Sequence, residues 1–201
     1  MTAANQVTIF RILLIPVFVG FALYYGNSHE SGAPDERWRY AAIFTFLFAA
    51  GSDGLDGYLA RRFNQRTRLG SILDPIADKG LLISALITLS VSKWPDQFPL
   101  WFPLLVIARD VLAVGGALLL GHFAGLKELR PHWTGKVATV LQMGALGALM
   151  LQFPTWLMAN TMNAAAAFTL ASGAVYLAHA IRMVRMVEGT EPTQPNSSPP
   201  K

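Results

Sequence analysis

Six stretches of mostly apolar residues, each close to the length of a membrane-spanning helix, constrain this chain more than any other feature. They lie at residues 7–25, 40–58, 73–92, 100–122, 133–152 and 156–184. A helix needs about 20 apolar residues to cross the hydrocarbon core of a bilayer. Charged residues make up only 14% of the 201 residues, which is too few to cover a soluble domain of this size. The sequence therefore predicts an all-α integral membrane bundle of six transmembrane helices.

Basic residues predict how these helices are oriented. They gather at or beyond the ends of the second, fourth and sixth apolar stretches, at Arg61, Arg62, Arg66, Arg68, Lys127, Arg130, Arg182 and Arg185. By the positive-inside rule these segments face the cytoplasm, and so do both termini. In so apolar a chain, we attribute the net charge of +4 to orientation and to contact with anionic headgroups. We therefore expect membrane lipids, and no nucleic acid, as partners.

The two ends of the chain differ in composition. The first apolar stretch carries Arg11 and lacks a clear cleavage site after it, so we interpret it as a retained helix and not as a signal peptide. The last residues are rich in proline, serine, threonine and asparagine, a composition that cannot bury a core. We predict a membrane domain at 1–187 and a disordered tail at 188–201.

Four aspartates lie where the second and third apolar stretches meet the basic loop between them. Asp53 and Asp56 are three residues apart, and Asp74 and Asp78 are four residues apart. In helices these spacings place each pair on one face. Four neighbouring carboxylates repel one another unless cations lie between them. Hard ions with oxygen ligands suit such a site, Mg²⁺ first and Mn²⁺ as a possibility, and two pairs of carboxylates suit two ions.

The aspartates and their neighbours resemble the signature of the CDP-alcohol phosphotransferase family. The matching positions are Asp53, Asp56, Gly57, Ala60, Arg61, Gly70, Asp74 and Asp78. Asn5, Thr8 and Arg11 are similar to the amino-terminal consensus of the family. The resemblance covers nearly all of the chain except the tail, and it implies a six-helix catalytic domain that forms a homodimer.

The resemblance also implies a reaction and roles for these residues. An alcohol would attack the phosphoryl group of CDP-diacylglycerol, and CMP would leave. The four aspartates would bind metal, and Asp78 would also be the general base that takes the proton of the acceptor hydroxyl. The nucleotide would lie against Asp56, Gly57, Ala60, Arg61 and Gly70. The two glycines have no side chain, so a nucleotide can approach the backbone closely there.

Different segments resemble members of the family that use different acceptors. The stretches NQRTRLGSILDPIADKGLLIS and IARDVLAVGGALLL are similar to cardiolipin synthases, whose acceptor is phosphatidylglycerol. The stretches VTIFRILLIPVFV and WTGKVATVLQM are similar to phosphatidylglycerophosphate synthases, whose acceptor is glycerol 3-phosphate. The latter usually carry an arginine where this chain has Ala117 and Leu118. The resemblances therefore favour phosphatidylglycerol slightly, with glycerol 3-phosphate as the alternative and an inositol phosphate as a weaker one. The first two acceptors both belong to anionic phospholipid synthesis.

Two basic residues are candidates for binding the acceptor. Arg109 lies inside the fourth apolar stretch, where a guanidinium must find an anion or a cavity; a buried pair with an acidic neighbour would satisfy it equally well. Lys136 lies at the start of the fifth stretch and could bind a phosphate, or extend to the membrane surface.

Other classes of function fit the sequence less well. A cation transporter also uses aspartates within the membrane, but it would place them near the bilayer midplane, whereas these cluster towards one surface beside a basic loop. A non-catalytic scaffold would bind CDP-diacylglycerol without turnover. We expect an enzyme of the bacterial inner membrane whose active site faces the cytoplasm.

Overall fold

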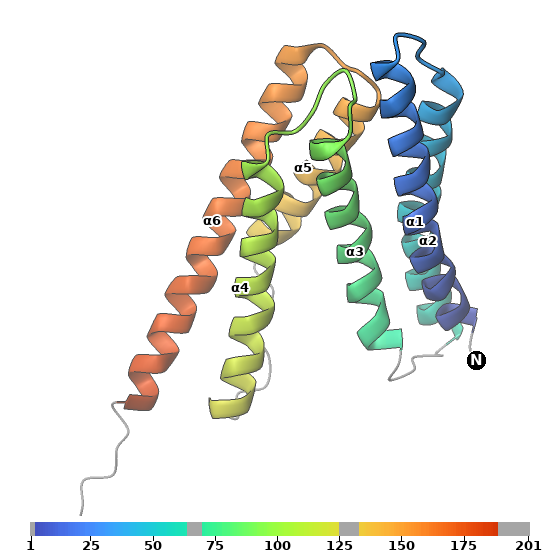
Figure 1. The fold of residues 1–201 in the computed structure, drawn as a ribbon. Helices are drawn as coiled ribbons and strands as arrows, with labels where there is room; N and C mark the ends of the chain where they lie inside the picture. Colours follow the sequence, from blue (N-terminus) through green and yellow to red (C-terminus); the bar gives the residue numbers. More distant parts are fainter. Residues whose placement is uncertain (1–2, 64–69, 125–132, 189–201) are drawn as a thin grey trace, which may run out of the picture.

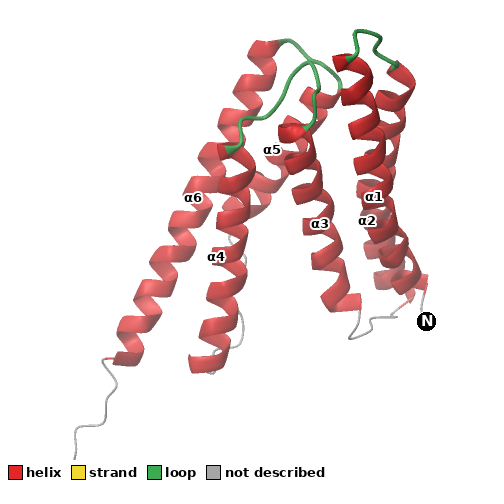
Figure 2. Cartoon of the chain, in the orientation of Figure 1, coloured by secondary structure: helices red, strands yellow, loops and turns green. Residues whose placement is uncertain are grey.

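The computed structural model describes residues 3–63, 70–124 and 133–188 of the chain, and these residues form six helices (Figure 1). In chain order they are α1 (Ala3–Glu30), α2 (Glu36–Phe63), α3 (Gly70–Val91), α4 (Trp101–Ala124), α5 (Trp133–Met150) and α6 (Thr155–Glu188). Within the described ranges there is no strand (Figure 2). Each predicted apolar stretch coincides with one helix, so the all-helical fold is confirmed. The predicted tail, apart from Glu188, lies outside the described residues.

Two of the helices are long and apolar enough to cross a membrane. These segments are Val7–Glu30 within α1 and Thr155–Ala178 within α6. For the other four helices, the six-helix membrane topology rests on the sequence alone. The six-span topology and the cytoplasmic location of the termini stay predictions.

The helices form two groups. In the first helix group, α1 packs along α2 and α3, and in the second helix group, α6 packs along α4 and α5. Contacts between the groups are fewer, and they join α3 to α4 and both α2 and α3 to α5. In Figure 1 the first helix group lies on the right, and α4 and α6 lie on the left.

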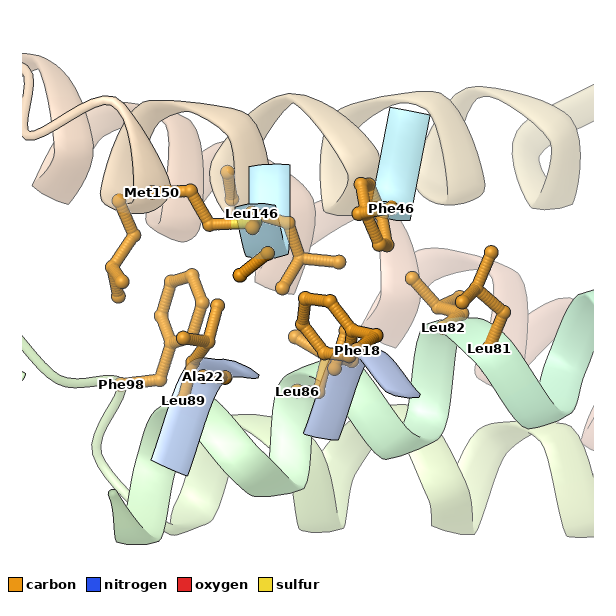
Figure 3. Close-up of a cluster of buried hydrophobic side chains, with 14 of the residues drawn as sticks. Phe18, Ala22, Phe46, Leu81, Leu82, Leu86, Leu89, Phe98, Leu146 and Met150 are labelled. Carbon is orange, nitrogen blue, oxygen red and sulfur yellow. The ribbon is translucent and has the colours of Figure 1, made fainter. Parts of the chain in front are cut away.

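A core of buried apolar side chains joins the two helix groups. Its members come from all six helices and the segment before α4, and they include Phe18, Ala22, Phe46, Leu81, Leu82, Leu86, Leu89, Phe98, Leu146 and Met150 (Figure 3). Leu82, Leu86 and Leu89 follow the spacing of one helix face. Close packing of this kind associates helices in lipid as well as in water, because it gains van der Waals contacts.

Polar contacts also join the groups at one end of the bundle, here called the loop end, which carries the loops 31–35, 92–100 and 151–154. Gln152, in the turn between α5 and α6, donates from Nε2 to the Tyr25 hydroxyl at 2.8 Å and accepts a hydrogen bond from Arg39. The backbone of Gln152 is in the left-handed region, with φ of 53°, which is uncommon for a residue other than glycine. Its two hydrogen bonds hold the turn in this conformation and fix the loop end of the bundle.

Candidate active site

The motif residues lie on two contacting helices at the opposite end of the bundle, here called the motif end, where α2 finishes and α3 begins. The last part of α2 carries Asp53, Asp56, Gly57, Ala60 and Arg61, and the first part of α3 carries Gly70, Asp74 and Asp78. Both segments are helical, so each pair of aspartates is separated by about one turn. The predicted helical placement is confirmed. Of these positions, only that of Asp78 lies where side chains are described, and convergence of the four carboxylates stays a prediction.

The carboxylate of Asp78 pairs with an arginine from α1. Nη1 of Arg11 donates to Oδ1 of Asp78. The Arg11 side chain is 1% exposed and the Asp78 side chain is 44% exposed. A covered guanidinium thus orients a carboxylate that is open to an approaching substrate, through a charge-assisted hydrogen bond. The sequence showed Arg11 within the first apolar stretch and the amino-terminal resemblance, but it did not reveal this pairing. An arginine inside an apolar stretch needs an anion, and this need was the sign in the sequence that Arg11 would form an ion pair.

A second charged cluster lies beside the first and centres on Asp110 of α4. Lys79 of α3 donates from Nζ to Oδ2 of Asp110 at 2.6 Å. Arg109 donates from Nη1 to Oδ1 of Asp110 at 2.7 Å. The Asp110 side chain is only 9% exposed, and a buried carboxylate requires such partners. Each of its two oxygens therefore accepts a hydrogen bond from a different cation.

The remaining donors of Arg109 are directed at α6. Nε and Nη2 donate to the hydroxyl of Ser172 at 3.1 and 2.7 Å. The guanidinium lies over the ring of Tyr176, with Cζ 5.4 Å from the ring centroid, a cation–π arrangement. The structure thus shows the buried pairing with an acidic neighbour that was one of the two interpretations of Arg109. Direct binding of the acceptor by Arg109 stays a prediction.

The other predicted acceptor residue, Lys136, lies near the start of α5 and has an exposed side chain. Helix α5 begins at the motif end and finishes at the loop end. Lys136 is therefore at the same end of the bundle as the aspartates, although it belongs to the other helix group. The structure leaves its ammonium group accessible, and its acceptor-binding role stays a prediction.

Gly135 allows α5 to pack directly on the Arg109 guanidinium. A Cβ added at Gly135 would collide with Nη2 of Arg109 and lie 3.4 Å from Oγ of Ser172. Because Arg109 is held on several sides, we expect Gly135→Ala to lower the free energy of unfolding by about 1–3 kcal/mol. Thermal unfolding in detergent would measure this change.

The matched control for that substitution is Gly144→Ala on the same helix. A Cβ added at Gly144 meets no atom within 4 Å, so this variant should be as stable as the original chain or slightly more stable, because alanine favours helix. Equal stability of the Gly135→Ala and Gly144→Ala variants would contradict the close packing of α5 on Arg109.

Comparison with known proteins gives a consistent assignment. The family model of CDP-alcohol phosphatidyltransferase matches residues 1–181. A probable phosphatidylglycerophosphate synthase of Mycobacterium tuberculosis (strain H37Rv) is 35% identical, over 93% of this chain and 85% of the relative. The CDP-diacylglycerol–glycerol-3-phosphate 3-phosphatidyltransferase of Haemophilus influenzae is 33% identical, over 84% of this chain and 83% of that protein. The Escherichia coli K12 protein of the same name is 33% identical, over 74% and 76% of the two chains. The charged motif of α2 and α3 and the match along almost all of its length thus show that the chain belongs to the CDP-alcohol phosphatidyltransferase family and is an enzyme of that class.

Proposed function

We propose that this enzyme transfers the phosphatidyl group of CDP-diacylglycerol to a hydroxyl of glycerol 3-phosphate and releases CMP. The observation that carries the proposal is the extended similarity to proteins whose names give these two substrates, in Haemophilus influenzae and Escherichia coli. The sequence-based preference for phosphatidylglycerol, and with it a role in cardiolipin synthesis, is not supported by these relatives. One of the two stretches behind that preference contains the aspartate motif, which serves the donor common to all these reactions and so says little about the acceptor.

The transfer reaction uses Asp78 as its general base. The acceptor hydroxyl oxygen attacks the phosphorus that carries the diacylglycerol group, and the bond from this phosphorus to the bridging oxygen of CMP breaks. Asp78 takes the proton of the attacking hydroxyl as general base. Its support is geometric, because its half-exposed carboxylate is oriented by Arg11. The ion pair holds the base in place before the substrates arrive.

Divalent cations fit the donor set at the motif end. We assign them to the carboxylates of Asp53, Asp56, Asp74 and Asp78, because oxygen donors one turn apart on two contacting helices suit hard ions such as Mg²⁺ or Mn²⁺. When bound, the ions would neutralise the diphosphate and stabilise the departing CMP. The nucleotide would lie against the same two segments, at Asp56, Gly57, Ala60, Arg61 and Gly70.

The phosphate of glycerol 3-phosphate requires a cationic partner that substrate can reach. Lys136 meets this requirement, since it is exposed at the motif end, and an ammonium group binds phosphate well as a point charge. Arg109 is buried behind Gly135 and already donates to Asp110 and Ser172. We therefore assign the direct contact to Lys136 and a supporting contact to Arg109.

We place the enzyme in a bacterial membrane with the motif end towards the cytoplasm. Large apolar side chains cover its outer faces; Phe44, Val140 and Trp156 are 72%, 70% and 65% exposed. Such surfaces are rare on soluble monomers and suit contact with lipid, the phase that also holds the donor. The two spans of α1 and α6 agree with this location. Homodimerisation stays a prediction.

An assay of acceptor choice tests the proposed function. Purified protein in detergent, given Mg²⁺ and CDP-diacylglycerol, should release CMP with glycerol 3-phosphate and yield phosphatidylglycerophosphate by mass spectrometry. Phosphatidylglycerol and inositol phosphate are the comparison acceptors, and a chelator is the metal control. CMP release with phosphatidylglycerol alone would restore the cardiolipin interpretation. CDP-diacylglycerol binding without CMP release for any acceptor would contradict the proposed transfer.

A further inference from the structure

Helix α3 is held at two consecutive residues by ion pairs with different helices. Asp78 pairs with Arg11 of α1, and Lys79 pairs with Asp110 of α4. Consecutive residues of an α-helix point in directions about 100° apart, because one turn takes 3.6 residues. The two ion pairs therefore restrain α3 from two sides at one level of the bundle. A rotation of α3 about its axis would break at least one of them.

The partner of Lys79 is itself firmly held. Asp110 also accepts a hydrogen bond from Arg109, and Arg109 donates to Ser172 of α6. On its other side the guanidinium is covered by Gly135 of α5. Through the Lys79–Asp110 pair, α3 is thus connected to all three helices of the second helix group.

The position of this ion pair matters because the two helix groups share few contacts. At the loop end they are joined by the hydrogen bonds of Gln152 to Tyr25 and Arg39. From there the apolar core continues along the bundle to Leu81 of α3 and Val106 of α4, within about one turn of the ion pair. Towards the motif end, the Lys79–Asp110 pair joins a helix of the first group to a helix of the second. Among the described residues, this ion pair therefore links the two helix groups close to Asp78, the proposed general base.

We propose that Lys79 and Asp110 form a positioning pair for the transfer reaction. The pair sets the rotation of α3, and with it the direction of the Asp78 carboxylate, and it holds the helix group that carries Lys136 against the group that carries the aspartates. This inference rests on the proposed function, in which the donor site belongs to α2 and α3 and the acceptor contact to α5. Asp110 touches neither substrate and acts through Lys79.

Kinetics of neutral and charge-conserving variants test the pair. Lys79→Gln and Asp110→Asn should each lower kcat/KM for glycerol 3-phosphate roughly ten- to a hundredfold, as small misplacements of reacting groups do, while the Kd for CDP-diacylglycerol changes less than about twofold. Lys79→Arg keeps the charge and should restore most of the loss. The double variant should be no worse than either single one, because coupled residues are not additive.

If Asp110→Asn does not fold, Lys79→Gln alone tests the proposal. The Lys79 side chain is 36% exposed, and the Arg109–Asp110 pair stays intact in this variant. Acceptor kinetics that are unchanged in Lys79→Gln would overturn the proposal. So would additive losses in the double variant, or the same loss in Lys79→Arg as in Lys79→Gln.

A distance measurement separates positioning from a general loss of stability. The chain has no cysteine, so pairs of spin labels can be attached at introduced cysteines. Leu13 of α1 and Val114 of α4 are exposed and span the two groups near the ion pair. We expect Lys79→Gln to lengthen or broaden this distance distribution. An unchanged distribution would overturn the positioning role.

The matched control pair is Leu23 of α1 and Leu104 of α4, also exposed and near the loop end. Its distance should be the same in both proteins, because Gln152 and the core hold that end. An equal change at both pairs would indicate general loosening and would overturn the proposal. If the original chain released no CMP with any acceptor, the proposed function would fail, whereas the label distances would still decide whether Lys79 and Asp110 hold the groups together.

Discussion

Asp78→Asn is expected to lower kcat by roughly 10²- to 10⁴-fold, the range that general bases contribute, and to leave the Kd for CDP-diacylglycerol within a few-fold of its original value. Asparagine keeps the shape of the side chain and an oxygen that can accept a hydrogen bond from Arg11 or bind a metal ion, but it cannot take the proton of the acceptor hydroxyl. Replacement of the charged hydrogen bond with Arg11 by a neutral one should also cost about 1–2 kcal/mol of folding free energy. The reaction and not the fold should therefore carry the larger effect.

Single-turnover CMP release and CDP-diacylglycerol binding, measured on the same preparation, separate these effects. Asp96→Asn is the matched control, because it makes the same chemical change in the loop between α3 and α4, at the other end of the bundle. It should retain full activity. Full activity in Asp78→Asn would remove Asp78 from the role of base. Lost donor binding would instead assign its carboxylate mainly to the metal and nucleotide.

The sequence predicted the number and order of the helices because each one contains an apolar stretch of nearly bilayer length. It predicted their ends less well. The stretch at 40–58 belongs to a helix that runs from Glu36 to Phe63, and the stretch at 156–184 to one that runs from Thr155 to Glu188. Helical hydrogen bonds are made by the backbone, so a helix continues through polar residues after its apolar stretch has ended.

The sequence predicted the helices that carry the motif but not the tertiary contacts of the residues around it. Spacing alone placed the aspartates one turn apart on two helices, and the helices are as expected. The pairing of Arg11 with Asp78 joins residues 67 positions apart, and that of Lys79 with Asp110 joins residues 31 apart. Such contacts depend on how helices pack, which periodicity does not specify. A sequence does specify that a partner is needed, because a charge in an apolar stretch must find one.

The two helix groups explain why donor and acceptor were predictable to different degrees. The motif proposed to bind the donor lies within one continuous segment that covers the end of α2 and the start of α3, so its spacing can be recognised in the sequence. The residues proposed to contact the acceptor lie on α4 and α5, which belong to the other group. Their relation to the aspartates depends on how the two groups are held, and the similarity of short stretches favoured an acceptor that the relatives do not support.

Asp56→Ala is expected to weaken metal and nucleotide binding together, in contrast to Asp78→Asn. Asp56 lies one turn after Asp53 and directly before Gly57 in α2, so the resemblance gives it both roles. Loss even of a group that supports a metal ligand costs 10- to 100-fold in affinity, and loss of a ligand itself should cost roughly a hundredfold or more. The Mg²⁺ concentration for half-maximal CMP release should rise by this factor, and the Kd for CDP-diacylglycerol should rise with it.

Two measurements make this prediction specific. Titrating Mg²⁺ against CDP-diacylglycerol binding reports the metal without relying on turnover, and Mn²⁺ in its place tests whether the site accepts another hard ion. Asp96→Ala is the control for removing a carboxylate elsewhere and should leave both titrations unchanged. Because Asp56→Ala removes a ligand and not the base, excess Mg²⁺ should restore part of its activity but none of that of Asp78→Asn. An unchanged Mg²⁺ dependence in Asp56→Ala would take Asp56 out of the ligand set, and the nucleotide would then have to be held at this end of α2 without it.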